Sequence, residues 1–152
     1  MAQFNSAEKI DKEDVNREEQ NVTNVVIEPT DVMTGDRNQA RYLLYQLKMS
    51  MKAAKRIDII VSFLMETGVR LILQDLKSAL DRGVEIRILT GNYLGITQPS
   101  ALYLIKKELG EQVDLRFYSE KERSFHPKSY IFHYENGGEI YIGSSNVSKS
   151  AL

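Results

Sequence analysis

The chain has 152 residues, of which 42% are hydrophobic and 27% are charged, ordinary proportions for one globular domain with a genuine core. No apolar run approaches the roughly 18 residues of a membrane span, and the N-terminus lacks the apolar stretch of a secretory signal, so we expect no membrane association. The absence of cysteine excludes disulfides and thiolate metal sites, and it fits a reducing, cytoplasmic location.

Charge is distributed unevenly along the chain. Residues 1–20 hold six acidic and three basic side chains, a net of −3, so the rest of the chain carries +2 of the total of −1. Because the first stretch is polar and without periodicity, we interpret residues 1–22 as a flexible acidic tail and residues 23–152 as one domain. A slightly basic body is compatible with a polyanionic ligand but does not require one.

Helix and strand signals alternate in the first half of this domain. A β-branched run at residues 25–27 predicts a first strand, and apolar residues at helical spacing predict a helix over 40–54. The nearly continuous apolar run 57–61 is typical of a strand buried on both faces. Helical spacing returns after it, and this second helix has Thr67 as its expected N-cap and Gly83 as its expected C-terminal stop.

The second half continues the alternation. The pattern predicts a strand at 84–88, a helix at Pro99–Leu109 closed by Gly110, a strand at 113–117, and two strands at 128–134 and 139–142. Asn136-Gly137 between the last two suits a hairpin, because this dipeptide tolerates positive φ. The β-α-β-α-β-α-β-β order predicts an α/β fold, with a mixed, largely parallel sheet flanked by helices as an α/β/α sandwich.

The chemistry-bearing residues lie in the last third of the chain. His126 and Lys128 are two positions apart, so on a strand both side chains project from the same face. A lysine supplies a mobile cationic donor for phosphate, and a neighbouring imidazole can attack phosphorus or transfer a proton near neutral pH. Gly143-Ser144-Ser145-Asn146 follows the next strand, where its hydroxyl, amide and backbone N–H groups can complete an anion site.

This combination resembles the signature of the phospholipase D superfamily (the HKD-type domains), with Gly-Ser-x-Asn beginning 17 residues after the histidine. The resemblance implies a metal-independent phosphodiesterase in which His126 is the nucleophile or its partner acid/base. It further implies that Lys128 and Asn146 bind the phosphate and that Ser144 is a supporting donor. Residues 89–97 look most like the domains fused to bacterial DEAD/DEAH-box helicases and related restriction endonucleases.

Two features depart from the family pattern. The family has an acidic residue five positions after the lysine, where this chain has His133, and an imidazole there is expected to be structural or solvent-facing because it points away from His126. The family site uses two copies of the motif, whereas this chain has one, so we expect a homodimer or a second copy elsewhere. We also expect the domain to be truncated at its C-terminal end.

Several functional hypotheses follow from the resemblance. The first is a nuclease-type domain that cleaves DNA through a phosphohistidine, within a helicase or restriction-type protein. The alternative is a catalytically inactive module that binds phosphate or DNA for a fused helicase. Phospholipid hydrolysis is less favoured, because no amphipathic basic helix is present.

Two residue-level interpretations stay open. Lys106-Lys107 is followed by an acidic residue and suits either a solvated face or a nucleic-acid path. Tyr93 suits either stacking on a base or packing in the core.

Overall fold

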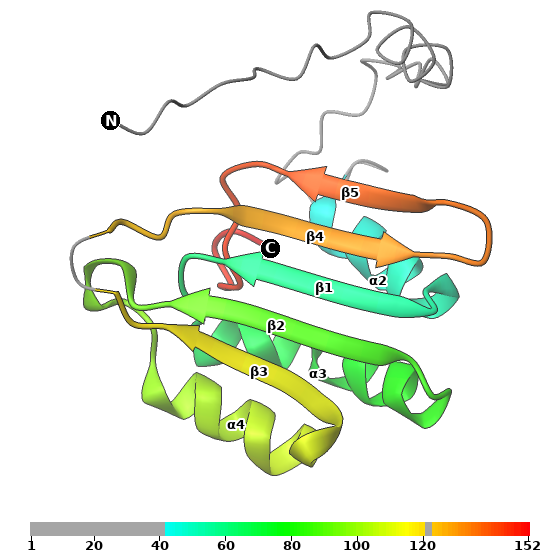
Figure 1. Ribbon diagram of the computed structural model, residues 1–152, viewed down its shortest axis with the longest axis horizontal. Coiled ribbons are helices and arrows are strands. Elements are labelled where there is room, and N and C mark those ends of the chain that lie inside the picture. The colour runs from blue at the N-terminus through cyan, green and yellow to red at the C-terminus, as the bar shows by residue number, and fades with distance from the viewer. Residues whose placement is uncertain (1–41, 121–122) are drawn as a thin grey trace, which may run out of the picture. The chain divides into compact units, whose positions relative to one another are not determined.

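The computed structural model describes residues 42–120 and 123–152. Its centre is a five-stranded sheet with the strand order β3-β2-β1-β4-β5 (Figure 1). The β1/β2 and β2/β3 pairs are parallel, and the β1/β4 and β4/β5 pairs are antiparallel. The carboxyl ends of β1, β2, β3 and β5 therefore meet at the edge where β4 begins. The strands are β1 Arg56–Val61, β2 Glu85–Gly91, β3 Val113–Tyr118, β4 Lys128–His133 and β5 Gly138–Ile142.

Three helices lie side by side behind this sheet in Figure 1. They are α2 Leu43–Ala53, α3 Glu66–Asp81 and α4 Pro99–Leu109, and two short 3-10 turns follow β2 and α4 at Tyr93–Gly95 and Gly110–Gln112. The expected α/β class, with a mixed sheet flanked by helices, is confirmed. Within residues 42–120 and 123–152 the helices cover one face of the sheet, and parallel and antiparallel pairs are equal in number.

The core lies between the helices and the sheet. Alternate residues of β1 point into it, so Ile57, Ile59 and Val61 are fully or almost fully buried. Leu47 of α2 and Ile72 of α3 are buried against them in the same cluster. Each such side chain contributes about 1.5–3 kcal/mol by leaving water, which makes this layer the main support of the sheet edge described below.

Element boundaries agree closely with the sequence pattern, apart from one helix cap and the end of β2, which continues past the expected residue 88 to Gly91. The α4 helix spans Pro99–Leu109 as expected, and Gly110 ends it with a φ of 66°. The expected Thr67 cap of α3 is wrong, because the helix begins at Glu66 after Met65. The first amide groups of α3 find distant acceptors instead: Met65 N–H donates to the Val147 carbonyl, and Glu66 N–H donates to Oε1 of Gln98.

The predicted hairpin between β4 and β5 is confirmed. Gly137 has a φ of 95°, which a side chain would disfavour, and Tyr134 N–H donates to the Gly137 carbonyl at 2.9 Å. The strand expected at 25–27 and the acidic tail lie outside the described residues.

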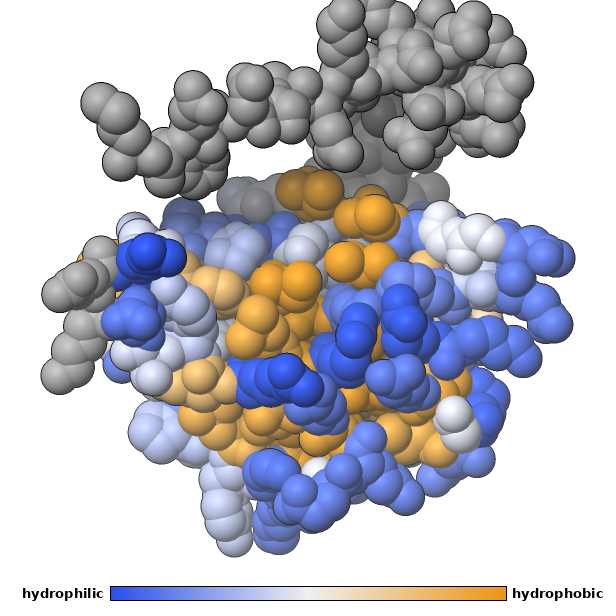
Figure 2. All heavy atoms as spheres, in the orientation of Figure 1, coloured by the Kyte–Doolittle hydropathy of each residue, from blue (hydrophilic) through white to orange (hydrophobic). Residues whose placement is uncertain are grey.

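The face of the sheet away from the helices carries both charged and apolar side chains. Ile140 and Ile142 of β5 are 62% and 81% exposed there, and apolar side chains gather beside charged ones in Figure 2. Among the described helices, none combines the length and apolar composition that crossing a bilayer requires.

Candidate functional site

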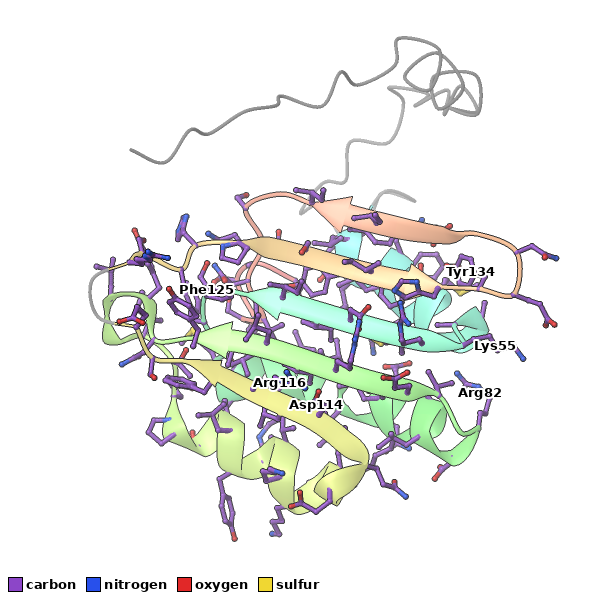
Figure 3. All side chains as sticks on the ribbon, viewed as in Figure 1. Lys55, Arg82, Asp114, Arg116, Phe125 and Tyr134 are labelled. Carbon is purple, nitrogen blue, oxygen red and sulfur yellow. The ribbon has the colours of Figure 1, made fainter. Side chains whose placement is uncertain are left out.

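The predicted site residues converge at one edge of the sheet. Val61 at the end of β1 pairs with Lys128 at the start of β4, so the segments after β1 and before β4 begin side by side. The segment after β5 joins them, since Gly143 N–H donates to the Lys128 carbonyl at 3.2 Å. Phe125, labelled in Figure 3, marks this end of the sheet. The site therefore lies beyond the carboxyl ends of the parallel strands, the usual ligand position in such sheets.

His126 and Lys128 are in direct contact. The ammonium Nζ of Lys128 lies 2.7 Å from Nε2 of His126, and it also donates to the His126 carbonyl at 3.1 Å. Lys128 is the first residue of β4, whereas His126 precedes the strand, so a loop rather than a regular pleat brings the two side chains together. Lys128 is 8% exposed while the His126 side chain remains exposed.

This contact constrains the hydrogen-bonding role of Nε2. Burial lowers the pKa of the Lys128 ammonium, because desolvation disfavours the charged form. When the ammonium is charged it can only donate, so Nε2 must accept with its lone pair, and the imidazole proton then resides on Nδ1. In that tautomer Nε2 carries no proton, and its lone pair becomes available to attack phosphorus once the ammonium turns to a phosphate oxygen.

Asn146 is buried near the same edge with a defined orientation. It is 4% exposed, and its Oδ1 accepts the N–H of Phe63 at 3.2 Å. Because the oxygen is thereby engaged, the amide nitrogen is the end that can donate to an anion. Ser62 reinforces the arrangement, since its fully buried hydroxyl donates to the Pro127 carbonyl at 3.0 Å, between His126 and Lys128.

Ser144 lies differently from the other predicted ligands. It is exposed in the turn after β5, two residues before the buried Asn146. Its neighbour Ser145 is held in place by the Tyr130 hydroxyl, which donates to the Ser145 carbonyl at 3.0 Å. Ser62, by contrast, has a buried hydroxyl at this edge, and it is a structural member of the site that the His-x-Lys and Gly-Ser-x-Asn spacing alone did not identify.

A second set of residues missed at the sequence level supports the backbone around the site. Thr97 is 8% exposed; its Oγ1 donates to the Gly91 carbonyl and accepts the Leu64 N–H at 3.3 Å. It thus joins the segments that follow β1 and β2. A position just beyond the carboxyl end of a strand was the signal that could have identified Thr97.

Gly68 permits close packing of α3 near the site, because a Cβ there would lie 2.3 Å from the carbonyl carbon of Val147.

One aromatic ring contacts His126, and two others stack on each other in neighbouring segments. The Tyr93 ring lies 4.3 Å from the His126 ring, centroid to centroid, at an interplanar angle of 45°. Phe125 stacks on Tyr118 at 4.8 Å and 21°. The sequence predicts either base stacking or core packing for Tyr93. In the structure its ring contacts His126 instead.

His133 lies on the opposite face of the sheet from Lys128, as the strand alternation predicts. Its Nε2 is 2.8 Å from Oδ2 of Asp58, a carboxylate that also accepts from Arg87 Nε at 2.5 Å and lies 3.5 Å from Arg56 Nε. Burial by itself would raise the pKa of the Asp58 carboxyl, but the hydrogen bonds from Arg87 and His133 bring it below its usual value. His133 therefore belongs to an ion-pair cluster away from His126.

The basic residues of α4 behave as a solvated surface where the structure describes them. Lys106 pairs with the exposed Glu111 at 2.9 Å, and Lys77 of α3 binds Glu108. Across 42–120 and 123–152, no group of three or more acidic or histidine side chains is arranged to hold a metal ion.

Comparisons with known proteins agree with this geometry. The family model described as "Cardiolipin synthase, PLD-like domain" matches residues 47–152. Among solved structures, the crystal structure of polyphosphate kinase from Porphyromonas gingivalis matches with a TM-score of 0.50 and 14% identity. That match covers 73% of this chain and 19% of the kinase chain, so this chain spans about a fifth of that protein, and the likeness concerns the fold alone. A search of curated proteins gave no match.

Proposed function

The chain belongs to the phospholipase D-like domain family, and from this premise we propose that it is a phosphodiesterase domain that cleaves DNA through a phosphohistidine intermediate on His126. The observation that supports the proposal most directly is the 2.7 Å contact between Nζ of Lys128 and Nε2 of His126. It pairs a nucleophilic lone pair with a cation at the edge where the buried Asn146 also lies.

The reaction proceeds in two displacements. In the first, the Nε2 lone pair attacks phosphorus, a P–N bond forms, and the P–O bond to the leaving group breaks. A second imidazole donates its proton to the departing oxygen. In the second displacement this imidazole removes a proton from water, the water oxygen attacks phosphorus, and the P–N bond breaks to release the phosphomonoester.

Lys128 and Asn146 stabilise the charge that develops on the non-bridging phosphate oxygens. The ammonium moves from Nε2 of His126 to a phosphate oxygen over a short distance, and the Asn146 amide nitrogen donates a further hydrogen bond. Donors that are already oriented cost little reorganisation, and the loss of one typically reduces turnover by about 10²–10³-fold. Ser144 is then a peripheral donor at the exposed rim of the site.

The second imidazole comes from another copy of the motif. His133 cannot supply it, because it lies on the opposite face of the sheet in contact with Asp58. A homodimer that joins two such edges across a two-fold axis would bring two His126 side chains to one phosphate, as would a second motif in a longer polypeptide. The reaction needs no metal ion, since histidine, lysine and asparagine supply nucleophile, acid and anion ligands.

DNA as substrate, and fusion to a helicase or restriction-type protein, are the finer parts of the proposal. They are supported by the resemblance of residues 89–97 to helicase-fused and endonuclease members of the family. In the structure this segment follows β2 and contributes Tyr93, whose ring contacts His126, and Thr97, which joins two strand ends. The proposed location is cytoplasmic.

The decisive experiment measures cleavage of bis(p-nitrophenyl) phosphate and of plasmid DNA in EDTA. We expect cleavage by the natural chain, none by His126→Ala, and about 10²–10³-fold slower cleavage by Lys128→Ala. His133→Gln is the matched control, because it alters the other histidine of the chain on the opposite face and should retain activity. Cleavage that stops in EDTA, or that survives in His126→Ala, would refute the mechanism.

The alternative function is an inactive module that binds DNA phosphates for a fused helicase. It is favoured by one observation, namely that residue 133 is a histidine bound to Asp58 where the family has an acid. This module would show salt-sensitive DNA affinity, reduced in Lys128→Ala, without turnover in any longer form of the protein.

A further inference from the structure

The turn after β2 presses an aromatic ring against the histidine of the site. It comprises Asn92–Ile96 and is closed by two backbone hydrogen bonds of 3.1 Å, from Gly95 N–H to the Asn92 carbonyl and from Ile96 N–H to the Tyr93 carbonyl. Tyr93 is half-buried in this turn, and its ring centroid lies 4.3 Å from that of His126. The two rings come from segments 33 positions apart in the sequence.

The turn is held at an unfavourable backbone conformation. Leu94 has a φ of 52° and a ψ of 23°, the left-handed region that a branched side chain rarely adopts. Its side chain is 79% exposed, so burial of that side chain does not account for the conformation. Strain of this kind persists where surrounding contacts determine the backbone, and it is frequent at functional sites.

The anchors of the turn lie on both sides. At its end, the buried Thr97 binds the Gly91 carbonyl and the Leu64 N–H, which connects the turn to the carboxyl ends of β1 and β2. Before it, Gly91 lies against Phe125, whose Cδ1 would be 2.9 Å from an added Cβ. The turn and the segment that carries His126 are thereby held in one arrangement.

We propose that Tyr93 is a positioning residue for His126, an inference that rests on the proposed function of that histidine. The imidazole contacts both the Tyr93 ring, at 4.3 Å between centroids, and Nζ of Lys128, which is 2.7 Å from Nε2. Without the Tyr93 ring, the exposed imidazole can rotate about its side-chain bonds and turn Nε2 away from Lys128. Tyr93 thus directs the nucleophilic nitrogen toward the place where phosphate binds.

The position of residue 133 supports this assignment. An acidic group at that position would be remote from His126, because β4 directs residue 133 to the opposite face, where it contacts Asp58. The contacts that orient the His126 ring in this structure are with Tyr93 and Lys128. The position of the nucleophile strongly affects the reaction rate, since a misplacement of about 1 Å can reduce the rate by about 10²-fold.

The test compares Tyr93→Leu with Tyr93→Phe in the full chain by two independent measurements. The first is NMR of the ring ¹⁵N and ¹H nuclei of the two histidines, with His133 as internal reference. We expect Tyr93→Leu to shift the His126 ring protons and to abolish its fixed Nδ1–H tautomer, whereas Tyr93→Phe preserves both. The second is steady-state cleavage of bis(p-nitrophenyl) phosphate, where kcat should fall by about 10²-fold in Tyr93→Leu with KM unchanged.

Each outcome decides the proposal. Unmoved His126 resonances in Tyr93→Leu would overturn it, whether or not the chain cleaves phosphodiesters. A raised KM with unchanged kcat would also overturn it, and would make Tyr93 a substrate contact. An inactive chain in which the His126 tautomer still depends on the Tyr93 ring would refute the proposed phosphodiesterase function and leave the positioning role intact.

Discussion

Nζ of Lys128 lies 2.7 Å from Nε2 of His126, and only 8% of Lys128 is exposed to water. A charged amine at such a position loses hydration, which the contacts with the His126 ring and carbonyl compensate only in part. The fold therefore keeps a cation where an apolar residue would be easier to accommodate. Such a position is typical of a residue retained for binding an anion.

Lys128→Met is expected to separate function from stability. Removal of a partly desolvated charge should leave the free energy of unfolding at least as high as in the natural chain, while cleavage should fall by about 10²–10³-fold. Denaturant unfolding and kinetic assays measure the two effects. Lys106→Met, which alters an exposed lysine on α4, should change neither, and a large loss of stability in Lys128→Met would contradict the prediction.

Gly68→Ala should destabilise the protein and disturb the site at once. The added Cβ would meet the backbone carbonyl carbon of Val147 at 2.3 Å, so α3 or the segment that carries Asn146 must move. We expect a loss of about 1–3 kcal/mol in the free energy of unfolding. Gln74→Ala, at an exposed position of the same helix, should stay within about 0.5 kcal/mol, and equal stability of the two variants would refute the packing argument.

The ionised Asp58 carboxyl should make the free energy of unfolding depend on pH. Hydrogen bonds from Arg87 and His133 lower the pKa of this carboxyl in the folded state below its ordinary value of 3.8, despite burial. The stability it contributes is therefore present above that ordinary value and is lost as the pH falls through the folded-state pKa.

Asp58→Asn tests this contribution. At pH 7 the variant should lose about 1–3 kcal/mol, because the arginine and histidine donors lose a charged acceptor. The difference from the natural chain should shrink as the pH falls below about 4. Denaturant titrations between pH 7 and pH 3 measure it, and a constant difference across that range would exclude the assigned role of the carboxylate.

Leu94→Gly should be tolerated by the fold. Glycine adopts the positive φ of this position without the steric cost that leucine bears, while the gain is offset by the greater freedom of the unfolded chain. Since the leucine side chain is 79% exposed, little apolar burial is lost. We expect a free energy of unfolding within about 1 kcal/mol of the natural value by thermal unfolding. Leu64→Gly, a fully buried counterpart, should lose far more.

Much of the fold follows from local periodicity. The α4 boundaries at Pro99 and Leu109, the β1 run and the β4/β5 hairpin were predicted because apolar spacing and turn residues act over a few positions. His126 and Lys128, two positions apart, were predicted to share one face of a strand; the side chains do meet, but His126 precedes β4 and a loop brings them together. Asn146 was assigned through a family resemblance, and the structure buries it against the segment after β1.

The sequence by itself thus determined the elements, the α/β class and the pair His126 and Lys128. Only the tertiary structure decided that Tyr93 contacts His126, that His133 binds Asp58 across 75 positions, and that the described helices share one face of the sheet. The physical reason is that helical and strand patterns record which side of an element is apolar. Which distant side chain meets that element depends on strand order and on the path of the connections, and no local pattern records either.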